Sequence, residues 1–498
     1  MKIKGADETQ GFYDRNTILQ VFDQNHFNLV IIELLILVLL LVMGIFRDYE
    51  IFQLPAAASF TLLLTIFIMF AGAFSYWFGS WSGTVALVLV LVINFMVKEG
   101  IFNKTYEAYG IDYDTGQSSY NLQAIEQLTA PNVVNADKQR GQQILANWKA
   151  KFDPNTKPKM VFLCASGGGQ RAALWTLYSL QVADSLTNGQ LMKNSMLITG
   201  ASGGLIGASY FRELYLRKQE QEIDNLYSKQ YFDHLGSDNL NAVIFSLLMN
   251  DMFVGFQEFN YKGQNYSKDR GYAFEQQLNK NTGYILDKPL SAYKQPERES
   301  KIPMLIMAPT IINDGRTLYI SPQHVSYMMD DASDTVYTSE KINGIEFLRF
   351  FEDQRADSLR FLSGLRMSAT FPYITPNITL PSTPPMEIMD AGITDNFGIS
   401  DAVRFLYAFK EWIAENTSGV VLVSIRDSEK EEPIKKEDKL SLFEKFSLPI
   451  SSIYQNFQSL QDITNDDRVE YAEKLVSGQY RKSRHSVYTG RIYERKPS

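Results

Sequence analysis

The chain has 498 residues, which is too long for one ordinary hydrophobic core and predicts two or three structural units. Its hydrophobic fraction of 45% and charged fraction of 21% are those of a folded protein and exclude a disordered chain. The net charge of −8 without a dense basic block argues against nucleic acid as a partner, and the single cysteine, Cys164, excludes an intramolecular disulfide and a cysteine-based zinc site.

Three long apolar runs follow an N-terminal tail of residues 1–27. They cover residues 28–46, 56–78 and 81–97, and each is about long enough to cross a hydrocarbon core of ~30 Å at 1.5 Å per residue. Buried core helices are the alternative, which three such runs in close succession disfavour. We therefore predict an all-α transmembrane region of three helices over residues 28–98.

Two details refine this prediction. Trp77 and Trp81 flank Gly79 and Ser80, where an interfacial aromatic belt would lie, so the second and third runs read as a tight hairpin. A cleaved signal peptide is disfavoured because the first run begins late and is too long for the apolar part of such a signal.

Three spans would put the N-terminal tail and the rest of the chain on opposite sides of the membrane. The basic residues near the spans divide evenly between the two sides, so the positive-inside rule gives no orientation. Without a secretory signal or disulfides, we expect an integral membrane protein of the bacterial inner membrane, with its large domain in the cytoplasm. A homo-oligomer that forms through the transmembrane region is a further possibility.

The remaining chain changes composition several times. Residues 99–157 are polar and read as a connector with one helix, Ala136–Phe152. Residues 158–426 alternate short β-rich runs with amphipathic helices, which predicts a parallel α/β sheet. A helical, aromatic-rich insertion interrupts this pattern at about 219–299, and residues 427–498 read as a helical and basic C-terminal extension.

The first motif that carries chemistry is a glycine-rich turn. An apolar run, Met160–Ala165, leads into Ser166-Gly167-Gly168-Gly169-Gln170-Arg171, after which a helix begins at Ala172. Such a turn leaves unpaired backbone N–H groups aimed at one point, where they bind a phosphate or a transition-state oxyanion. Two alternatives stay open here: the turn also fits the dinucleotide fingerprint G-x-G-x-x-A, and it also fits a tight turn without a ligand.

The second motif favours the oxyanion. A strand over Ser195–Thr199 precedes Gly200-Ala201-Ser202-Gly203-Gly204, and a helix follows over Leu205–Arg217. G-x-S-x-G between a strand and a helix is typical of a nucleophile elbow, in which Gly200 and Gly204 leave room for a strained serine. Ser202 is therefore the candidate nucleophile; the alternative is a serine that caps the helix.

A serine nucleophile needs a base. Asp390 ends an apolar stretch just before Gly392, so its carboxylate is expected at a strand end. Asp395 competes, but its position before a new helical pattern suits a capping role, and we favour Asp390. Ser202, Asp390 and His485 also follow the chain order of an α/β-hydrolase triad, although the basic segment around His485 is more typical of a solvated tail.

Taken together, these motifs resemble the patatin-like phospholipases and their relatives, the cytosolic group-IV phospholipases. The resemblance lies in Ser-Gly-Gly-Gly-x-Arg-Ala, Gly-x-Ser-Gly-Gly and Asp-x-Gly-Ile-x-x-Asn, in that order, and extends to 366–372 and 309–315. It covers roughly residues 158–426. The aspartate motif reads Asp-Ala-Gly where plant patatins have Asp-Gly-Gly or Asp-Gly-Ala, a small-residue change that the group-IV branch tolerates.

The resemblance implies a three-layer, parallel-sheet hydrolase domain that uses a Ser–Asp dyad without histidine. Ser202 would attack the ester and Asp390 would act as base, while the amides of Gly167, Gly168 and Gly169 would hold the oxyanion. Arg171 would lie near the lipid phosphate. We expect a membrane-anchored lipid acyl hydrolase that acts on phospholipids or lysophospholipids without a metal or cofactor. An acyltransferase with the same dyad and a non-catalytic, lipid-binding membrane scaffold are the alternatives.

Overall fold

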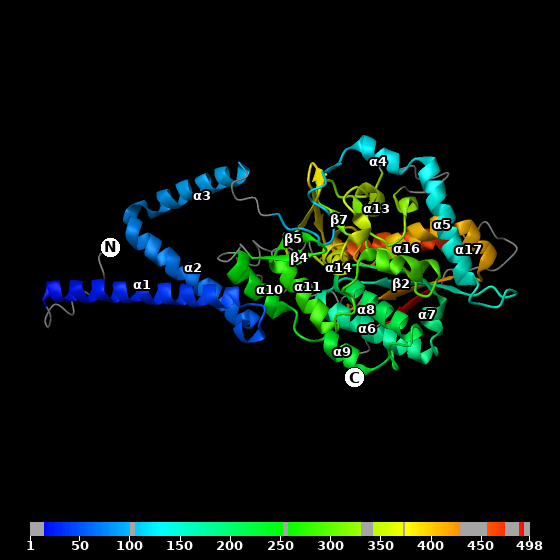
Figure 1. Ribbon diagram of the computed structural model, residues 1–498, viewed down its shortest axis with the longest axis horizontal. Coiled ribbons are helices and arrows are strands. Elements are labelled where there is room, and N and C mark those ends of the chain that lie inside the picture. The colour runs from blue at the N-terminus through cyan, green and yellow to red at the C-terminus, as the bar shows by residue number, and fades with distance from the viewer. Residues whose placement is uncertain are drawn as a thin grey trace, which may run out of the picture.

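The computed structural model describes residues 14–99, 105–251, 257–329, 342–371, 374–428 and 456–473, and the backbone of 488–492. Figure 1 shows that the N-terminal apolar helices extend away from a larger unit of strands and helices. These apolar helices are α1 (Arg15–Ile45), α2 (Ala56–Phe78) and α3 (Ser82–Lys98).

Two helical stretches, Asn16–Ile45 and Ala56–Lys98, are long and apolar enough to cross a membrane, and most of their side chains are exposed. The second stretch has 43 residues. It contains both the second and the third predicted span, and it bends at a short 3₁₀ turn, Gly79–Trp81, where α2 and α3 meet at an angle (Figure 1). Three separate spans therefore stay a prediction.

A parallel sheet forms the centre of the larger unit, as the sequence predicts. Its five strands are, in spatial order, β14 (Tyr488–Ile492), β13 (Val420–Ile425), β2 (Met160–Ala165), β3 (Ser195–Gly200) and β6 (Met304–Leu305). The middle strands are almost entirely buried on both faces, which is typical of a parallel sheet covered by helices.

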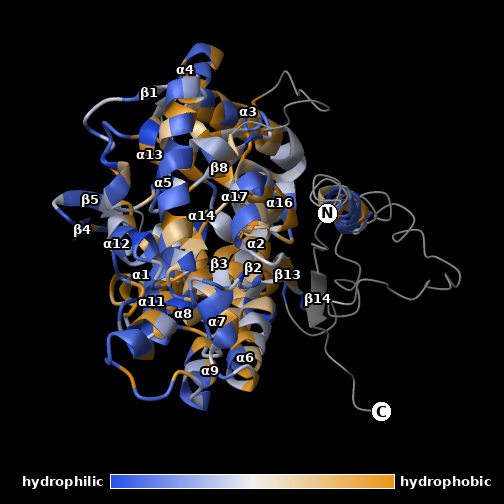
Figure 2. Cartoon of the chain, turned by 90° about the vertical axis from the view of Figure 1, so that its right-hand side faces the viewer, coloured by the Kyte–Doolittle hydropathy of each residue, from blue (hydrophilic) through white to orange (hydrophobic). Residues whose placement is uncertain are grey.

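Helices cover both faces of this sheet. Alternate residues of β2 point to opposite sides: Val161, Leu163 and Ala165 join one core cluster, and Phe162 and Cys164 join the other. The first face is covered by α6 (Gly169–Leu186) and α8 (Ser202–Gln219), and the second by α5 (Pro131–Lys149) and α16 (Ile399–Ala408). Figure 2 shows hydrophilic residues on the outward sides of α5 and of α7 (Gln190–Asn194). The three-layer α/β prediction is confirmed for this unit.

A second sheet lies beside the first, and the sequence analysis did not predict it. Its order is β10 (Ile378–Leu380), β12 (Met386–Met389), β7 (Thr310–Ile311), β8 (Thr317–Tyr319) and β9 (Gly344–Glu346). Its pairs are antiparallel except for β8 with β9. A short parallel pair also joins β1 (Ser118–Ser119) to β11 (Ser382–Thr383). The second sheet matters because β12 ends directly before Asp390.

The remaining helices surround these sheets. They are α4 (Leu122–Leu128), α9 (Lys229–Leu235), α10 (Leu240–Ser246), α11 (Arg270–Asn281), α12 (Lys294–Arg298), α13 (Phe347–Phe350), α14 (Phe361–Ser368), α15 (Gly392–Asp395) and α17 (Lys410–Asn416). A π-helical turn, Leu247–Asp251, follows α10, and a further helix covers residues 456–473.

Two expectations about segments are wrong in part. The insertion at about 219–299 is not wholly helical, because β4 (Glu258–Tyr261) and β5 (Gln264–Ser267) form an antiparallel hairpin within it. The connector is not a linker where the structure describes it: Tyr109 is 1% exposed, and its amide donates to the Ser363 hydroxyl at 3.0 Å. This segment is anchored by contacts with residues far along the chain, which composition does not reveal.

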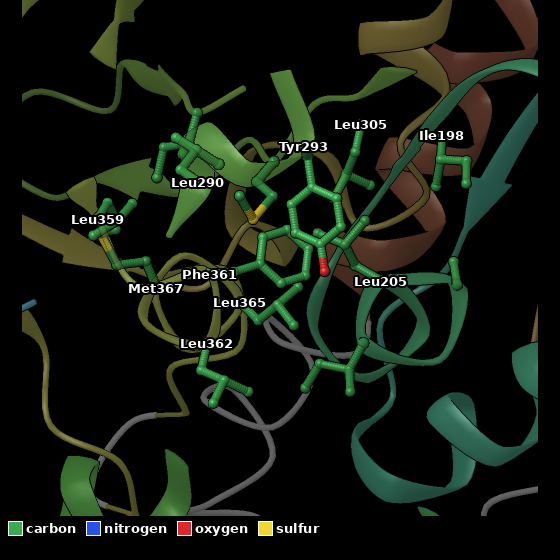
Figure 3. Close-up of a cluster of buried hydrophobic side chains, with 14 of the residues drawn as sticks. Ile198, Leu205, Leu290, Tyr293, Leu305, Leu359, Phe361, Leu362, Leu365 and Met367 are labelled. Carbon is green, nitrogen blue, oxygen red and sulfur yellow. The ribbon is translucent and has the colours of Figure 1, made fainter. Parts of the chain in front are cut away.

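A buried core lies between α14 and α8, the helix that begins at Ser202. Figure 3 shows Leu205 of α8 facing a cluster that includes Phe361, Leu365 and Tyr293. The rings of Tyr293 and Phe361 lie 4.6 Å apart between centroids. Fully buried packing of this kind fixes α8 rigidly.

Glycines allow α6 and α8 to pack with their backbones in contact. A Cβ atom at Gly203 would overlap the carbonyl oxygen of Gly169, and one at Gly207 would overlap that of Ala173. The two contacts repeat at a spacing of four residues on both helices, which is one helical turn. Gly207 therefore allows the close approach of α6 and α8 about one helical turn after Ser202.

We predict that Gly207→Ala lowers the free energy of unfolding of the larger unit by about 1–3 kcal/mol, because the added methyl group overpacks a backbone contact. This cost exceeds the ~1 kcal/mol that alanine gains from helix propensity. Urea unfolding of the full chain in detergent measures the change. Gly83→Ala in α3 is the control, since a Cβ there meets no atom within 4 Å. Equal stability of both variants would contradict the packing argument.

Candidate active site

Ser202 stands at a sharp turn between β3 and α8. Its φ angle is +49°, a left-handed conformation that serine rarely adopts, and Gly200 before it has φ +152°. A Cβ at Gly200 would overlap the carbonyl oxygen of Ala165, so only glycine fits there. Ser202 is also the first residue of α8, whose N-terminal dipole stabilises negative charge. This is the strained geometry expected of a nucleophile elbow.

Asp390 meets Ser202 from the other sheet. It follows β12 directly, and its interaction with the Ser202 side chain lowers the pKa of its carboxyl group. Its Oδ1 also accepts the Gly392 amide at 2.6 Å. Burial raises the pKa of Asp390 to about 7, although the hydrogen bonds from Gly392 and Ser202 oppose that shift. The sequence analysis named this pair, and the structure brings the two side chains together.

The competing aspartate, Asp395, caps a helix. Its carboxylate accepts the amides of Phe397 at 3.2 Å and Ser400 at 2.7 Å, at the start of α16. Burial raises its pKa, and it does not line the cleft around Ser202. This geometry agrees with the capping role that the sequence favours for Asp395.

The glycine-rich turn lies beside Ser202, but its three amides are not equivalent. The Gly167 amide donates to the carbonyl oxygen of Asn396 at 2.9 Å, so it is not free to bind an oxyanion. The expectation for Gly167 needs correction for this reason. The amides of Gly168 and Gly169 have no acceptor within the described part of the chain, and both residues line the cleft next to Ser202. The candidate oxyanion donors are therefore these two amides.

Arg171 does not occupy the expected position near a lipid phosphate. Its Nε and Nη2 donate to Asp427 Oδ2 at 3.0 and 2.9 Å, and it does not line the cleft. Its side chain is 75% exposed, whereas that of Asp427 is 5% exposed. The guanidinium thus compensates a buried carboxylate beside the turn, a role that the sequence motif could not distinguish from ligand binding.

The remaining candidate for a catalytic triad, His485, lies outside the described residues. Among the described residues that line the cleft there is no histidine. The described part of the chain also contains no group of three or more His, Cys, Asp or Glu side chains that would hold a metal ion.

An apolar cleft of about 910 Å³ opens at Ser202 and Asp390. Side chains from α8, α10 and α11, from the segment after α14 and from the 456–473 helix form its walls; they include Ile206, Val243, Phe274, Leu278, Phe371, Ile374 and Phe457. A cleft of this size and apolar character is large enough for an apolar ligand that reaches Ser202. The sequence analysis did not identify these wall residues, because they come from five separate segments.

Asn396 is a further site residue that lies inside the aspartate motif but received no role from the sequence. Its carbonyl binds the Gly167 amide, and its side chain lies where a Cβ of Gly167 or of Gly392 would be. It therefore sits between the glycine-rich turn and the loop that carries Asp390. Its place in the motif is the signal that could have found it.

Comparison with known families gives a match over residues 163–403 to the family described as "Patatin-like phospholipase". This segment contains Ser202, Asp390 and the glycine-rich turn. Residues 163–403 thus match a patatin-like phospholipase domain. A comparison with curated proteins finds no significant match.

Several solved structures are similar to the chain at low identity. Human GIVD cytosolic phospholipase A2 is 11% identical with a TM-score of 0.33, over 61% of this chain and 50% of that chain. The same enzyme with methyl gamma-linolenyl fluorophosphonate is 16% identical with a TM-score of 0.27, over 39% and 28%. VipD from Legionella pneumophila is 14% identical with a TM-score of 0.20, over 48% and 47%. The chain thus spans half or less of the length of these structures.

The raised pKa of Asp390 predicts how Ser202 reactivity depends on pH. Only ionised Asp390 accepts a proton, so the rate of Ser202 labelling by a serine-directed fluorophosphonate should rise with pH and level off above the pKa of about 7. Below that pKa the rate should fall about tenfold per pH unit. Ser202→Ala gives the background. A rate that stays constant down to pH 5 would show that Asp390 is not the controlling group.

Proposed function

We propose that this protein is a membrane-anchored serine lipid acyl hydrolase that cleaves acyl esters of phospholipids or lysophospholipids through a Ser202–Asp390 dyad. The observation that carries the proposal is the placement of a strained serine, at a strand–helix elbow, beside a buried carboxylate in the wall of an apolar cleft. The patatin-like domain supports the same reaction class.

The first half of the reaction forms an acyl-enzyme. Asp390 takes the proton of the Ser202 hydroxyl while Oγ attacks the ester carbonyl carbon. The amides of Gly168 and Gly169, at the N-terminus of α6, stabilise the negative charge on the carbonyl oxygen. The tetrahedral intermediate collapses as the ester C–O bond breaks, and Asp390 returns the proton to the departing alcohol oxygen.

The second half releases the fatty acid. Asp390, ionised again, removes a proton from water, whose oxygen attacks the acyl carbon. The bond to Ser202 Oγ then breaks, Oγ regains the proton, and the acid leaves. A base whose pKa is about 7 suits both halves, because near neutral pH it exchanges a proton in either direction at low cost.

The contact between the N-terminal helices and α10 supports the membrane anchor. The amide of Ala56, where α2 begins, donates to Asn241 Oδ1 at 2.6 Å, and Arg47 Nη1 donates to Ser246 at 3.1 Å. Leu40 of α1 packs against Phe245 of α10. The other side of α10 lines the cleft, so the cleft lies at the level where α1 ends and α2 begins. A lipid then reaches the site by diffusion within the membrane.

Loss of either member of the dyad should abolish turnover. Ser202→Ala and Asp390→Asn should each lower kcat on a lysophospholipid by about 10³-fold or more, and the double variant should lose little more, because the two residues act as one unit. Mass spectrometry of the released fatty acid measures the rates. His485→Ala should keep most of the activity. If it is as inactive as Ser202→Ala, a Ser–His–Asp triad replaces the dyad.

Membrane attachment should resist treatments that remove peripheral proteins. Spans of this length are held by the hydrophobic effect, so the full chain should stay in the membrane pellet in high salt and in carbonate, whereas electrostatic attachment is screened by salt. A chain that begins at Tyr106 is the control and should be released. Recovery of the full chain in the supernatant would contradict the anchor and leave the dyad unaffected.

A further inference from the structure

The helix over residues 456–473 lies outside the family match but contacts the catalytic loops directly. Phe457 and Gln458 at its start line the cleft. One turn further on, Gln461 faces the loop that follows Asp390. The sequence analysis treated this region only as a helical extension.

Gln461 uses its whole amide group on that loop. Its Oε1 accepts the Asn396 amide at 2.9 Å, and its Nε2 donates to the carbonyl oxygens of Gly392 at 3.0 Å and Ile393 at 3.1 Å. The Gly392 amide in turn binds the Asp390 carboxylate at 2.6 Å. One side chain therefore fixes the peptide groups on both sides of the turn that orients the base.

The same hydrogen bonds extend to the oxyanion side of the site. The backbone amide of Asn396 donates to Gln461, and the carbonyl oxygen of Asn396 accepts the Gly167 amide at 2.9 Å. Gly167 immediately precedes the two glycines whose amides are free for an oxyanion. A shift of Asn396 would thus move the base and the oxyanion donors relative to Ser202.

Other contacts hold the helix in place without Gln461. Arg426, at the end of β13, forms a two-bond ion pair with Asp462, with Nη2 2.7 Å from Oδ2, and its guanidinium lies 4.2 Å from the centre of the Phe397 ring. Asn465 Oδ1 accepts the Ser400 hydroxyl at 3.0 Å, and Ala472 is buried in the core. The attachment of the helix and the contact of Gln461 with the loops are therefore separable.

We propose that Gln461 is a positioning residue of the active site, which holds the Asp390 loop and the glycine-rich turn in register with Ser202. The proposal rests on the dyad mechanism above. It makes the C-terminal helix part of the catalytic apparatus. Because Gln461 acts through backbone groups, its loss should affect the rate of the chemical step more than the binding of the acyl chain.

The test compares three variants of the full chain in detergent. Gln461→Leu removes all three hydrogen bonds at similar side-chain volume, and Gln461→Glu keeps the acceptor but removes both donors. Leu460→Ala is the matched control, because Leu460 lies on the same helix and is 62% exposed. We expect Gln461→Leu to lower kcat by about 10–100-fold, the range for a misplacement on the order of 1 Å. KM and the thermal midpoint should change little, and Gln461→Glu should lose activity in the same direction.

The outcomes separate this proposal from the proposed function. If the wild type hydrolyses the lysophospholipid and Gln461→Leu keeps a kcat within about twofold of it, the positioning role is wrong and the dyad stands. If activity falls only in proportion to the folded fraction, as fluorophosphonate titration would show, the helix is merely structural and the proposal is wrong. If Gln461→Leu does not fold, unchanged kcat in Gln461→Glu overturns it. A wild type that neither hydrolyses esters nor reacts at Ser202 removes the proposed function and this role together.

Discussion

The backbones of α6 and α8 touch because glycine stands at the contact positions of α8. Gly203 and Gly207 lie against the carbonyl oxygens of Gly169 and Ala173, and Gly204 lies against that of Ser166. Both helices follow neighbouring parallel strands, so their N-termini meet at the same edge of the sheet. The close approach places a serine and a set of free amides at one point, where two helix dipoles favour negative charge. A larger residue at any of these positions would overlap the backbone of the glycine-rich turn or of α6.

The proposed base, Asp390, comes from a different part of the fold, and hydrogen bonds hold its loop at this point. Asp390 stands at the end of β12 in the second sheet, and its loop binds the glycine-rich turn after β2 through the hydrogen bond between Gly167 and Asn396. A buried carboxylate without an ion pair is costly, and the protein compensates with the Gly392 amide and the Ser202 hydroxyl. Burial outweighs these two groups and raises the pKa of Asp390 to about 7, which suits its proposed role as a base near neutral pH. The strained backbone of Ser202 and the buried carboxylate of Asp390 thus occur where the two side chains meet.

The helix α10 connects the site with the apolar N-terminal region. One side packs on α1 and α2, and the other lines the cleft. A displacement of the N-terminal helices would therefore change the wall of the cleft.

The sequence by itself determined what depends on short stretches of chain. The strand β2 has the bounds of the apolar run seen in the sequence, Met160–Ala165, because a continuous apolar run before a turn signal identifies a buried strand. The serine in its glycine-rich elbow and the aspartate before Gly392 were found from local motifs, since the strained turn and the strand end leave a local signature. The apolar N-terminal helices follow from composition alone.

Only the tertiary structure decided which groups are free and which are already bonded. It showed that the carbonyl oxygen of Asn396 accepts the Gly167 amide, that Asp427 binds Arg171, and that residues 108–111 are packed into the core. It also brought Gln461 to the Asp390 loop across 69 residues of sequence. A hydrogen bond between distant segments depends on how sheets and helices pack, and no local pattern of residues records that partner.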